Sequence, residues 1–131
     1  MPALSFQKQF APAVESGKKL QTVRPLRKVR PFRVGDVAAL YTGMRTKNCR
    51  LLGSGDVISV EPIEIASCDL QAGARAIIRV NIGPWSLSKK EREAFAKADG
   101  FTDARDMARW FAERYVGAVF RGVLIRWKLR S

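Results

Sequence analysis

Residues 17–24 read GKKLQTVR, and this short stretch decides how we interpret the chain. It follows a segment with helical spacing, so Gly17 is the expected end of a helix. The residues after Gly17 alternate as in a strand, and this alternation places Thr22 and Arg24 on the same face. Lys19 lies at the start of that strand, where the turn at Gly17 can bring it to the same side. A lysine, a hydroxyl and an arginine together make a corner suited to an anion or an amide.

Outward from this stretch, strand and helix patterns follow one another in an irregular order. Alternating residues predict strands at 3–6, 19–24, 37–42, 56–65, 74–82 and 119–129. Helical spacing predicts helices at 7–16, 88–98 and 103–115. Pro12 favours a start of the first helix near Ala11, and Ser88 with Glu91 has the spacing of a capping box. Thr102 is the expected cap of the last helix.

The order is not a regular alternation of strand and helix. It predicts a single α+β domain over residues 1–131, with a mostly antiparallel, barrel-like sheet. Within the sheet, Pro62 predicts an edge or a bulge. Within the last helix, Arg109 and Glu113 are spaced to form an ion pair.

The basic residues are concentrated at the two ends of the chain. The whole chain has 24 basic and 12 acidic residues, a net charge of +12. Residues 1–50 have a net charge of +9 and residues 121–131 of +4, whereas residues 51–120 have a net charge of −1. We predict that the two basic ends share one face, as in proteins that bind the phosphates of a nucleic acid. A solvated basic surface without a partner is the alternative.

Several classes of site are excluded by missing residues. The chain has no histidine, which rules out Ser-His-Asp and Cys-His catalysis and metal sites that need imidazole. Cys49 and Cys68 are too few for a four-cysteine zinc site, and the glycine motifs for nucleotide phosphates are missing. We therefore expect no metal and no cofactor.

Two reduced thiols and the lack of a signal-peptide core in residues 1–10 favour the cytoplasm. No apolar run reaches the roughly 18–20 residues that a membrane helix needs.

Two basic loops extend the predicted anion-binding surface. Residues 25–33, PLRKVRPFR, combine four basic residues with Phe32 as a stacking group. Residues 43–48 form the second loop, and Tyr41 before it either stacks on a base or belongs to the core. The candidate nucleic-acid-binding or ligand-binding residues are Lys18, Arg24, Arg30, Arg33, Tyr41, Arg45 and Lys47.

The spacing G-x-K-x-x-T-x-R of residues 17–24 resembles the signature of the ASCH domain family, which belongs to the PUA-like superfamily. The family usually has G-x-K-x-x-E-x-R. Gly17, Lys19 and Arg24 match, and Thr22 stands where glutamate is more usual. The resemblance continues at residues 35–36, 40–47 and 99–101. It implies a PUA-like β-barrel, mostly antiparallel and flanked by helices, that binds RNA in a cleft beside the barrel.

The resemblance also implies a catalytic set. Some ASCH proteins are small amidohydrolases that remove the acetyl group from N4-acetylcytidine with a lysine, a threonine and a glutamate. The lysine falls on Lys19, the threonine on Thr22 and the acid near Asp99. A threonine hydroxyl needs a base, and Lys19 is the candidate if desolvation or the neighbouring Lys18 and Arg24 lower its pKa. Asp99 then orients the lysine or protonates the leaving amine.

Three functions remain open. The first is an RNA- or nucleoside-binding domain with a basic cleft. The second is an amidohydrolase acting on an N4-acylated cytidine, or a ribonuclease, since other family members are reported as ribonucleases. The third is a reader of modified bases in DNA, as some related PUA-like folds are. For the site itself, we expect Lys19, Thr22 and Arg24 to line one pocket with Asp99 near its rim.

Overall fold

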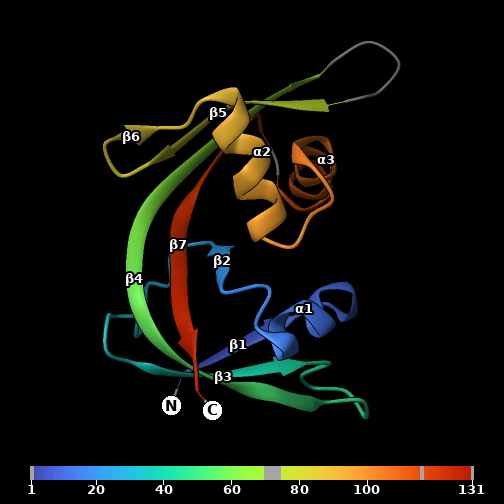
Figure 1. Ribbon diagram of the computed structural model, residues 1–131, viewed down its shortest axis with the longest axis vertical. Coiled ribbons are helices and arrows are strands. Elements are labelled where there is room, and N and C mark those ends of the chain that lie inside the picture. The colour runs from blue at the N-terminus through green and yellow to red at the C-terminus, as the bar shows by residue number, and fades with distance from the viewer. Residues whose placement is uncertain (1, 70–74, 116, 131) are drawn as a thin grey trace. The chain divides into compact units, whose positions relative to one another are not determined.

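The computed structural model describes residues 2–69, 75–115 and 117–130. Its helices are η1 (Lys8–Phe10, a short 3-10 turn), α1 (Ala11–Ser16), α2 (Lys89–Ala98) and α3 (Ala104–Arg114) (Figure 1). Its strands are β1 (Ala3–Phe6), β2 (Gln21–Arg24), β3 (Val37–Thr42), β4 (Arg50–Asp69), β5 (Arg75–Ile82), β6 (Trp85–Ser86) and β7 (Val119–Leu129). The predicted α+β class is therefore confirmed. Ala74, which the predicted strand 74–82 included, lies outside the described residues.

The strands pair in the order β1-β3-β4-β5-β6, and β7 pairs with both β2 and β4. The β1–β3 pair is parallel, and the β3–β4, β4–β5 and β5–β6 pairs are antiparallel. Among the described strands, β1 and β6 end the path, so these pairings do not close into a barrel. The barrel expected from the family resemblance is therefore not confirmed.

Strand β4 is much longer than the predicted strand 56–65. It pairs with β3 through residues 50–56 and with β5 through residues 63–69. Pro62 stands just before the β5 pairing begins, so its missing N–H removes no hydrogen bond from that ladder. The register shift towards β5 lies instead between Ala66 and Ser67. The sequence pattern understated β4 because glycines at 53 and 55 hide the alternation of its first half.

The described chain divides into two compact units. Unit 1 comprises Met1–Thr22, Arg27–Val60 and Ile125–Ser131, and unit 2 comprises Val23–Leu26 and Glu61–Leu124. Strands β4 and β7 contribute residues to both units. The single-domain organisation over residues 1–131 stays a prediction.

The core of unit 1 is built around Trp127, which is 1% exposed. Its ring lies 5.8 Å from the ring of Phe6, measured between centroids. Gly55 on β4 leaves the space for it, because a Cβ at this position would lie only 2.6 Å from Trp127 Cδ1. Helix α1 begins at Ala11 with proline in its first turn, and it ends at Gly17 with φ of 83°, both as predicted.

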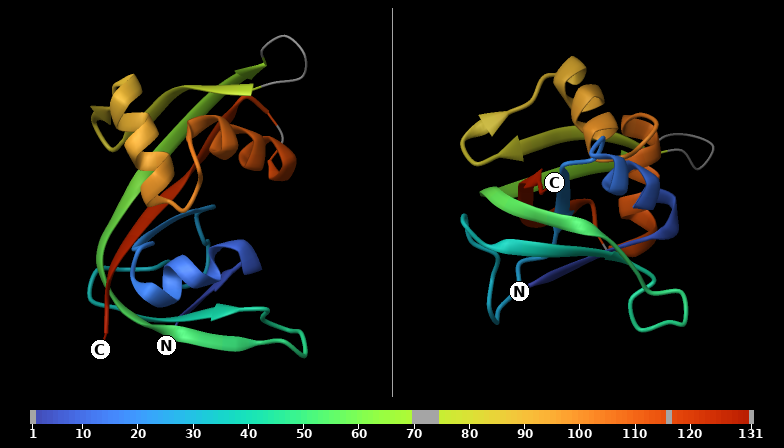
Figure 2. Two further views of the ribbon diagram at one scale, coloured as in Figure 1. Left: turned by 45° about the vertical axis from the view of Figure 1, so that its right-hand side comes forward. Right: turned by 60° about the horizontal axis from the view of Figure 1, so that its bottom comes forward.

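In unit 2, α2 and α3 pack on each other and on β5 (Figure 2). The predicted capping box at Ser88 is present. Helix α3 is capped by Asp103 and not by Thr102, because the Asp103 carboxylate accepts the N–H of Asp106 at 2.7 Å. The predicted pair of Arg109 and Glu113 is also wrong, since Arg109 binds Asp106 at 2.8 Å.

Among the described residues, no helix is long and apolar enough to cross a membrane.

We predict that Gly55→Ala lowers the free energy of unfolding by about 1–3 kcal/mol, the usual cost of overpacking a filled core. The added methyl group would overlap the indole of Trp127. Chemical denaturation of the wild type and the variant measures the effect. Ser54→Ala, at the neighbouring position, is the control and should change the free energy by less than about 0.5 kcal/mol. Equal stability of Gly55→Ala and the wild type would contradict this packing.

Candidate nucleic-acid interface

The positive charge of the chain belongs almost entirely to unit 1. Unit 1 contains 13 basic and three acidic residues, a net charge of +10. Unit 2 contains 11 basic and nine acidic residues, a net charge of +2. Most of both basic ends of the sequence therefore lie in the same compact unit, which favours the prediction that they form one surface.

Each of the three acidic residues of unit 1 forms an ion pair or a hydrogen bond with another residue of the same unit. Glu15 Oε2 lies 2.6 Å from Arg50 Nη1, and Asp56 Oδ1 lies 3.2 Å from Arg130 Nε. The carboxylate of Asp36 accepts the backbone N–H of Arg33 at 2.9 Å. These contacts oppose only a small part of the cationic charge, so the surface of unit 1 carries a strong positive potential.

Strand β4 brings the two basic ends of the chain together. The N–H of Gly35, directly after the basic loop, donates to the carbonyl of Val57 at 2.9 Å. The N–H of Arg130, at the end of β7, donates to the carbonyl of Ser54 at 2.8 Å. Both ends are thus fixed to the same stretch of β4. That Arg126 and Lys128 share a face with the basic loop stays a prediction.

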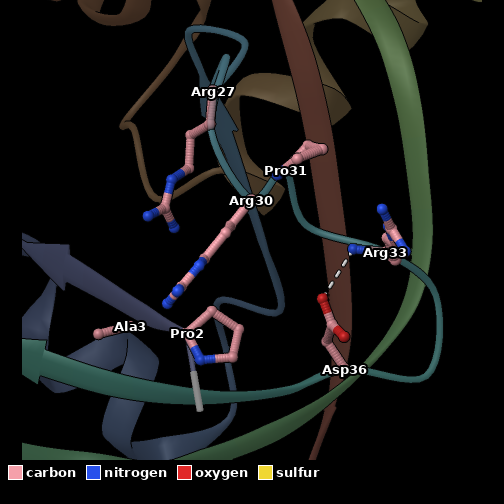
Figure 3. A pocket seen from close by; sticks show the side chains of 7 residues that line it. All are labelled: Pro2, Ala3, Arg27, Arg30, Pro31, Arg33 and Asp36. Atoms are coloured by element: carbon pink, nitrogen blue, oxygen red, sulfur yellow. Dashed lines mark hydrogen bonds between the residues drawn. The ribbon is translucent and has the colours of Figure 1, made fainter.

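The basic loop forms a hollow of about 540 Å³, which we call the arginine pocket (Figure 3). It is lined by Arg27, Arg30 and Arg33, together with Pro2, Ala3, Pro31 and Asp36. Figure 3 shows Arg27 and Arg30 extending in the same direction from the loop. Within the described part of the chain, none of the three guanidinium groups forms an ion pair. Figure 3 shows the Arg33 side chain apart from these two, near Asp36. The neighbouring cations of Arg27 and Arg30 are suited to hold an anion.

Arg30 and Arg33 were predicted as binding residues, and both line this pocket. Arg27 was missed, although its place in the same basic stretch was the available signal. Phe32, predicted as a stacking group, is only 7% exposed. Its ring lies beneath the Arg27 guanidinium, 5.4 Å from the centroid, so it supports an arginine and does not offer a free face.

A second hollow, of about 860 Å³, lies between α1 and the loop that joins β3 to β4. We call it the loop pocket. Its polar lining includes Ser5, Gln7, Thr42, Thr46 and Asn48. Phe6, Pro12 and Met44 add apolar surface, and Lys8 and Arg50 add cations.

Hydrogen bonds within the β3–β4 loop fix its shape. Thr46 Oγ1 donates to the carbonyl of Gly43 at 2.6 Å and accepts the N–H of Asn48 at 3.1 Å. Gly43 has a φ of 65°, and a Cβ there would lie 2.7 Å from the Asn48 carbonyl oxygen. Only glycine fits this turn without strain. The loop therefore presents its side chains from a rigid backbone.

Backbone strain marks both basic loops. Among the described non-glycine residues, positive φ is found at Arg30, with 51°, and Arg45, with 66°. Such a conformation costs roughly 1–2 kcal/mol and persists where the surrounding structure imposes it, often at ligand sites. Both arginines were predicted binding residues. Of the others, Lys18 and Lys47 are exposed, and Tyr41 is half-buried on β3.

Lys19 and Thr22 lie in unit 1 and are buried, with exposed fractions of 3% and 5%. The Nζ of Lys19 lies 5.1 Å from the ring centroid of Phe10 and 5.8 Å from that of Phe6. The ammonium is therefore held against two aromatic rings. Neither Lys19 nor Thr22 lines the arginine pocket or the loop pocket.

Arg24 and Asp99 belong to unit 2. Burial lowers the pKa of the Arg24 guanidinium, and its electrostatic interactions with Tyr115 and Asp99 oppose this change. Asp99 is the C-terminal cap residue of α2 and is 4% exposed. The structure thus brings Arg24 and Asp99 into one electrostatic cluster, to which Tyr115 adds a member that the sequence motif did not indicate.

The described residues include no group of three or more cysteine, aspartate or glutamate side chains arranged to hold a metal ion. Cys49 is exposed and Cys68 is half-buried, and both carry free thiols.

We predict that Asp99→Asn lowers the free energy of unfolding by about 1–3 kcal/mol, because it removes a buried negative charge that interacts favourably with the partly buried Arg24 cation. Denaturant titration measures the loss. Glu113→Gln is the control, since that carboxylate is exposed and lies 3.8 Å from its partner Arg114. A loss no larger than that of the control would mean that Asp99 does not compensate Arg24.

The comparisons with known proteins give no match. No protein-family model matches the chain. Neither the curated proteins nor the solved structures contain a match.

Proposed function

We propose that this chain is an RNA- or nucleoside-binding domain of the ASCH type, with a PUA-like arrangement of its sheet. The observation that carries the proposal is the arginine pocket, where Arg27, Arg30 and Arg33 line one hollow without an ion pair among the described residues. Guanidinium groups donate several hydrogen bonds in a fixed plane and match phosphate oxygens. The family assignment rests on residues 17–24.

The distribution of charge supports a polyanionic partner over a small neutral one. A net charge of +10 on unit 1 attracts phosphates over several ångströms and raises the rate of encounter. Specific readout then needs groups that recognise bases, since phosphate contacts alone are independent of sequence. A cytoplasmic location belongs to the same proposal and is supported by the two free thiols.

We predict that binding to single-stranded RNA weakens steeply with salt. Each neutralised phosphate contributes about −0.7 to the slope of log K against log salt, so three arginines give a slope of about −2 or steeper. Fluorescence anisotropy with a labelled oligonucleotide measures this slope. Arg30→Ala should make the slope shallower by about 0.7, because it removes one phosphate contact.

Arg105→Ala in unit 2 removes the same charge from an exposed position and is the matched control. It should leave the slope unchanged. No binding at low salt, or a flat response to salt, would contradict the proposal. A clear preference for DNA in the same titration would favour the alternative of a DNA base reader.

The second candidate is an amidohydrolase acting on an N4-acylated cytidine. The observation that favours it is burial, because Lys19, Thr22 and Asp99 are 3%, 5% and 4% exposed. Burying polar and charged groups is costly, so a fold that does so has either a structural or a chemical use for them. In this reaction the Thr22 hydroxyl attacks the acyl carbon while neutral Lys19 takes its proton. An acid protonates the amine as the C–N bond breaks, and water then releases the carboxylic acid from Thr22.

We predict for this candidate that the wild type converts N4-acetylcytidine to cytidine and acetate, and that Thr22→Val abolishes the conversion, because valine keeps the shape and lacks the nucleophile. Chromatography of the nucleosides measures the product. Thr102→Val replaces an exposed threonine of unit 2 that lines neither pocket, and it should retain activity. A wild type that releases no cytidine would exclude the amidohydrolase and leave the binding proposal untouched.

A further inference from the structure

The arginine pocket and the loop pocket lie at the two ends of the same strand, β1. Pro2 and Ala3, at the start of β1, line the arginine pocket. Ser5 and Gln7, at its end, line the loop pocket. Gln7 lies four positions after Ala3 along extended chain, which is a distance of about 13 Å. A ligand that spans about 13 Å can therefore reach from the arginine pocket to the loop pocket.

The exposed side of β1 connects them. Leu4 and Phe6 are buried, with exposed fractions of 2% and 4%, whereas Ser5 and Gln7 are exposed and Ala3 is half-buried. Alternation along the strand therefore places Ala3 and Ser5 on the outward face, leading from one hollow to the other. In the strand order β1-β3-β4-β5-β6, β1 is an edge strand, and among these strands it pairs with β3 alone.

Tyr41 lies beside this route. It is the register partner of Ser5 in the parallel β1–β3 pair, and register partners share a face of the sheet. Its ring is half-buried. A tyrosine at this position offers an aromatic surface to a base between the two hollows.

The lining of the loop pocket suits a nucleobase. Gln7 and Asn48 line the pocket, and a side-chain amide can both donate and accept hydrogen bonds, as base edges require. Pro12 and Met44 supply apolar surface for the faces of a ring. The volume of about 860 Å³ lies in the range of pockets that take small organic ligands. The hydrogen bonds of Thr46 hold the loop in place before a ligand arrives.

We propose that the loop pocket holds an unstacked base of a single-stranded nucleic acid whose phosphates lie in the arginine pocket. The inference rests on the proposed function and deepens it, because it names a single strand as the ligand. The bases of a duplex are paired and stacked, so none enters a side pocket without leaving the helix. A single strand exposes its bases and follows the outward face of β1 between the two hollows.

The experiment compares two labelled ten-nucleotide strands, one of ordinary RNA and one with the same backbone but without bases. Fluorescence anisotropy gives the affinity of each for the wild type and for Gln7→Ala and Asn48→Ala. We expect each variant to bind the RNA about three- to tenfold more weakly, the effect of one lost hydrogen bond. Neither should change the affinity for the abasic strand, whereas Arg30→Ala should weaken the binding of both strands.

Gln9→Ala is the matched control. Gln9 is the same residue type, is exposed, and lies in η1 two positions after Gln7, but it does not line the pocket. It should bind both strands as the wild type does. Circular dichroism confirms that each variant folds. For a variant that does not fold, NMR of the wild type replaces it, because the side-chain amide signals of Gln7 and Asn48 should shift with RNA and not with the abasic strand.

The outcomes separate the two proposals. If Arg30→Ala weakens binding but Gln7→Ala and Asn48→Ala leave RNA affinity unchanged, or weaken both strands equally, the base subsite is wrong and the proposed function stands. A duplex that binds as tightly as the single strand would also overturn the subsite. If the wild type binds neither strand, the proposed function fails and the base subsite fails with it.

Discussion

The backbone pairing of strand β4 is the constraint on which the rest of the structure depends. Every N–H and C=O group that leaves water must find a partner, and β4 meets this requirement over 20 residues by pairing with β3, β5 and β7. Its first half belongs to unit 1 and its second half to unit 2. Glycine at position 55 lets Trp127 pack directly on this strand. The carbonyls of Ser54 and Val57 hold the segments that carry the basic residues.

The two units treat their charges differently. In unit 2, Glu64 is bound by Arg79 at 2.6 Å and by Arg121 at 3.1 Å. The hydrogen bond from Arg79 is the largest cause that lowers the pKa of Glu64 below its ordinary value. The charges of unit 2 therefore oppose one another. Unit 1 has only three acidic residues, and its net charge of +10 is available to an external anion. This contrast is the reason why we place the proposed binding surface in unit 1.

In the proposed complex, the arginine pocket binds phosphates and the loop pocket binds a base. Guanidinium groups bind phosphates strongly but read no sequence, whereas amides and apolar side chains distinguish bases. Arg30 and Arg45 hold strained backbone conformations in the two loops that frame β1. Strain of this kind is retained when a loop must keep one shape, and a fixed loop loses less entropy when a ligand binds. The buried Lys19 and Thr22 stand apart from both hollows, which is why the amidohydrolase remains a separate candidate.

The sequence by itself determined the local elements. Local signals act on the backbone over a few positions, and the structure has the elements that they predict. These signals are proline at 12 for the start of α1, the capping residues at 88 and 91 for the start of α2, and the alternation of residues 119–129 for β7. It also gave the sign and the position of the charge. Contacts between segments far apart in the sequence were decided only by the tertiary structure. These long-range contacts set the length of β4. They also bring Arg24 near Asp99 and Tyr115, and they place Ala3 in one pocket with Arg27 and Arg30. A local sequence pattern does not predict such contacts, because they form only when the chain between the two segments has folded and its loop-closure entropy has been lost.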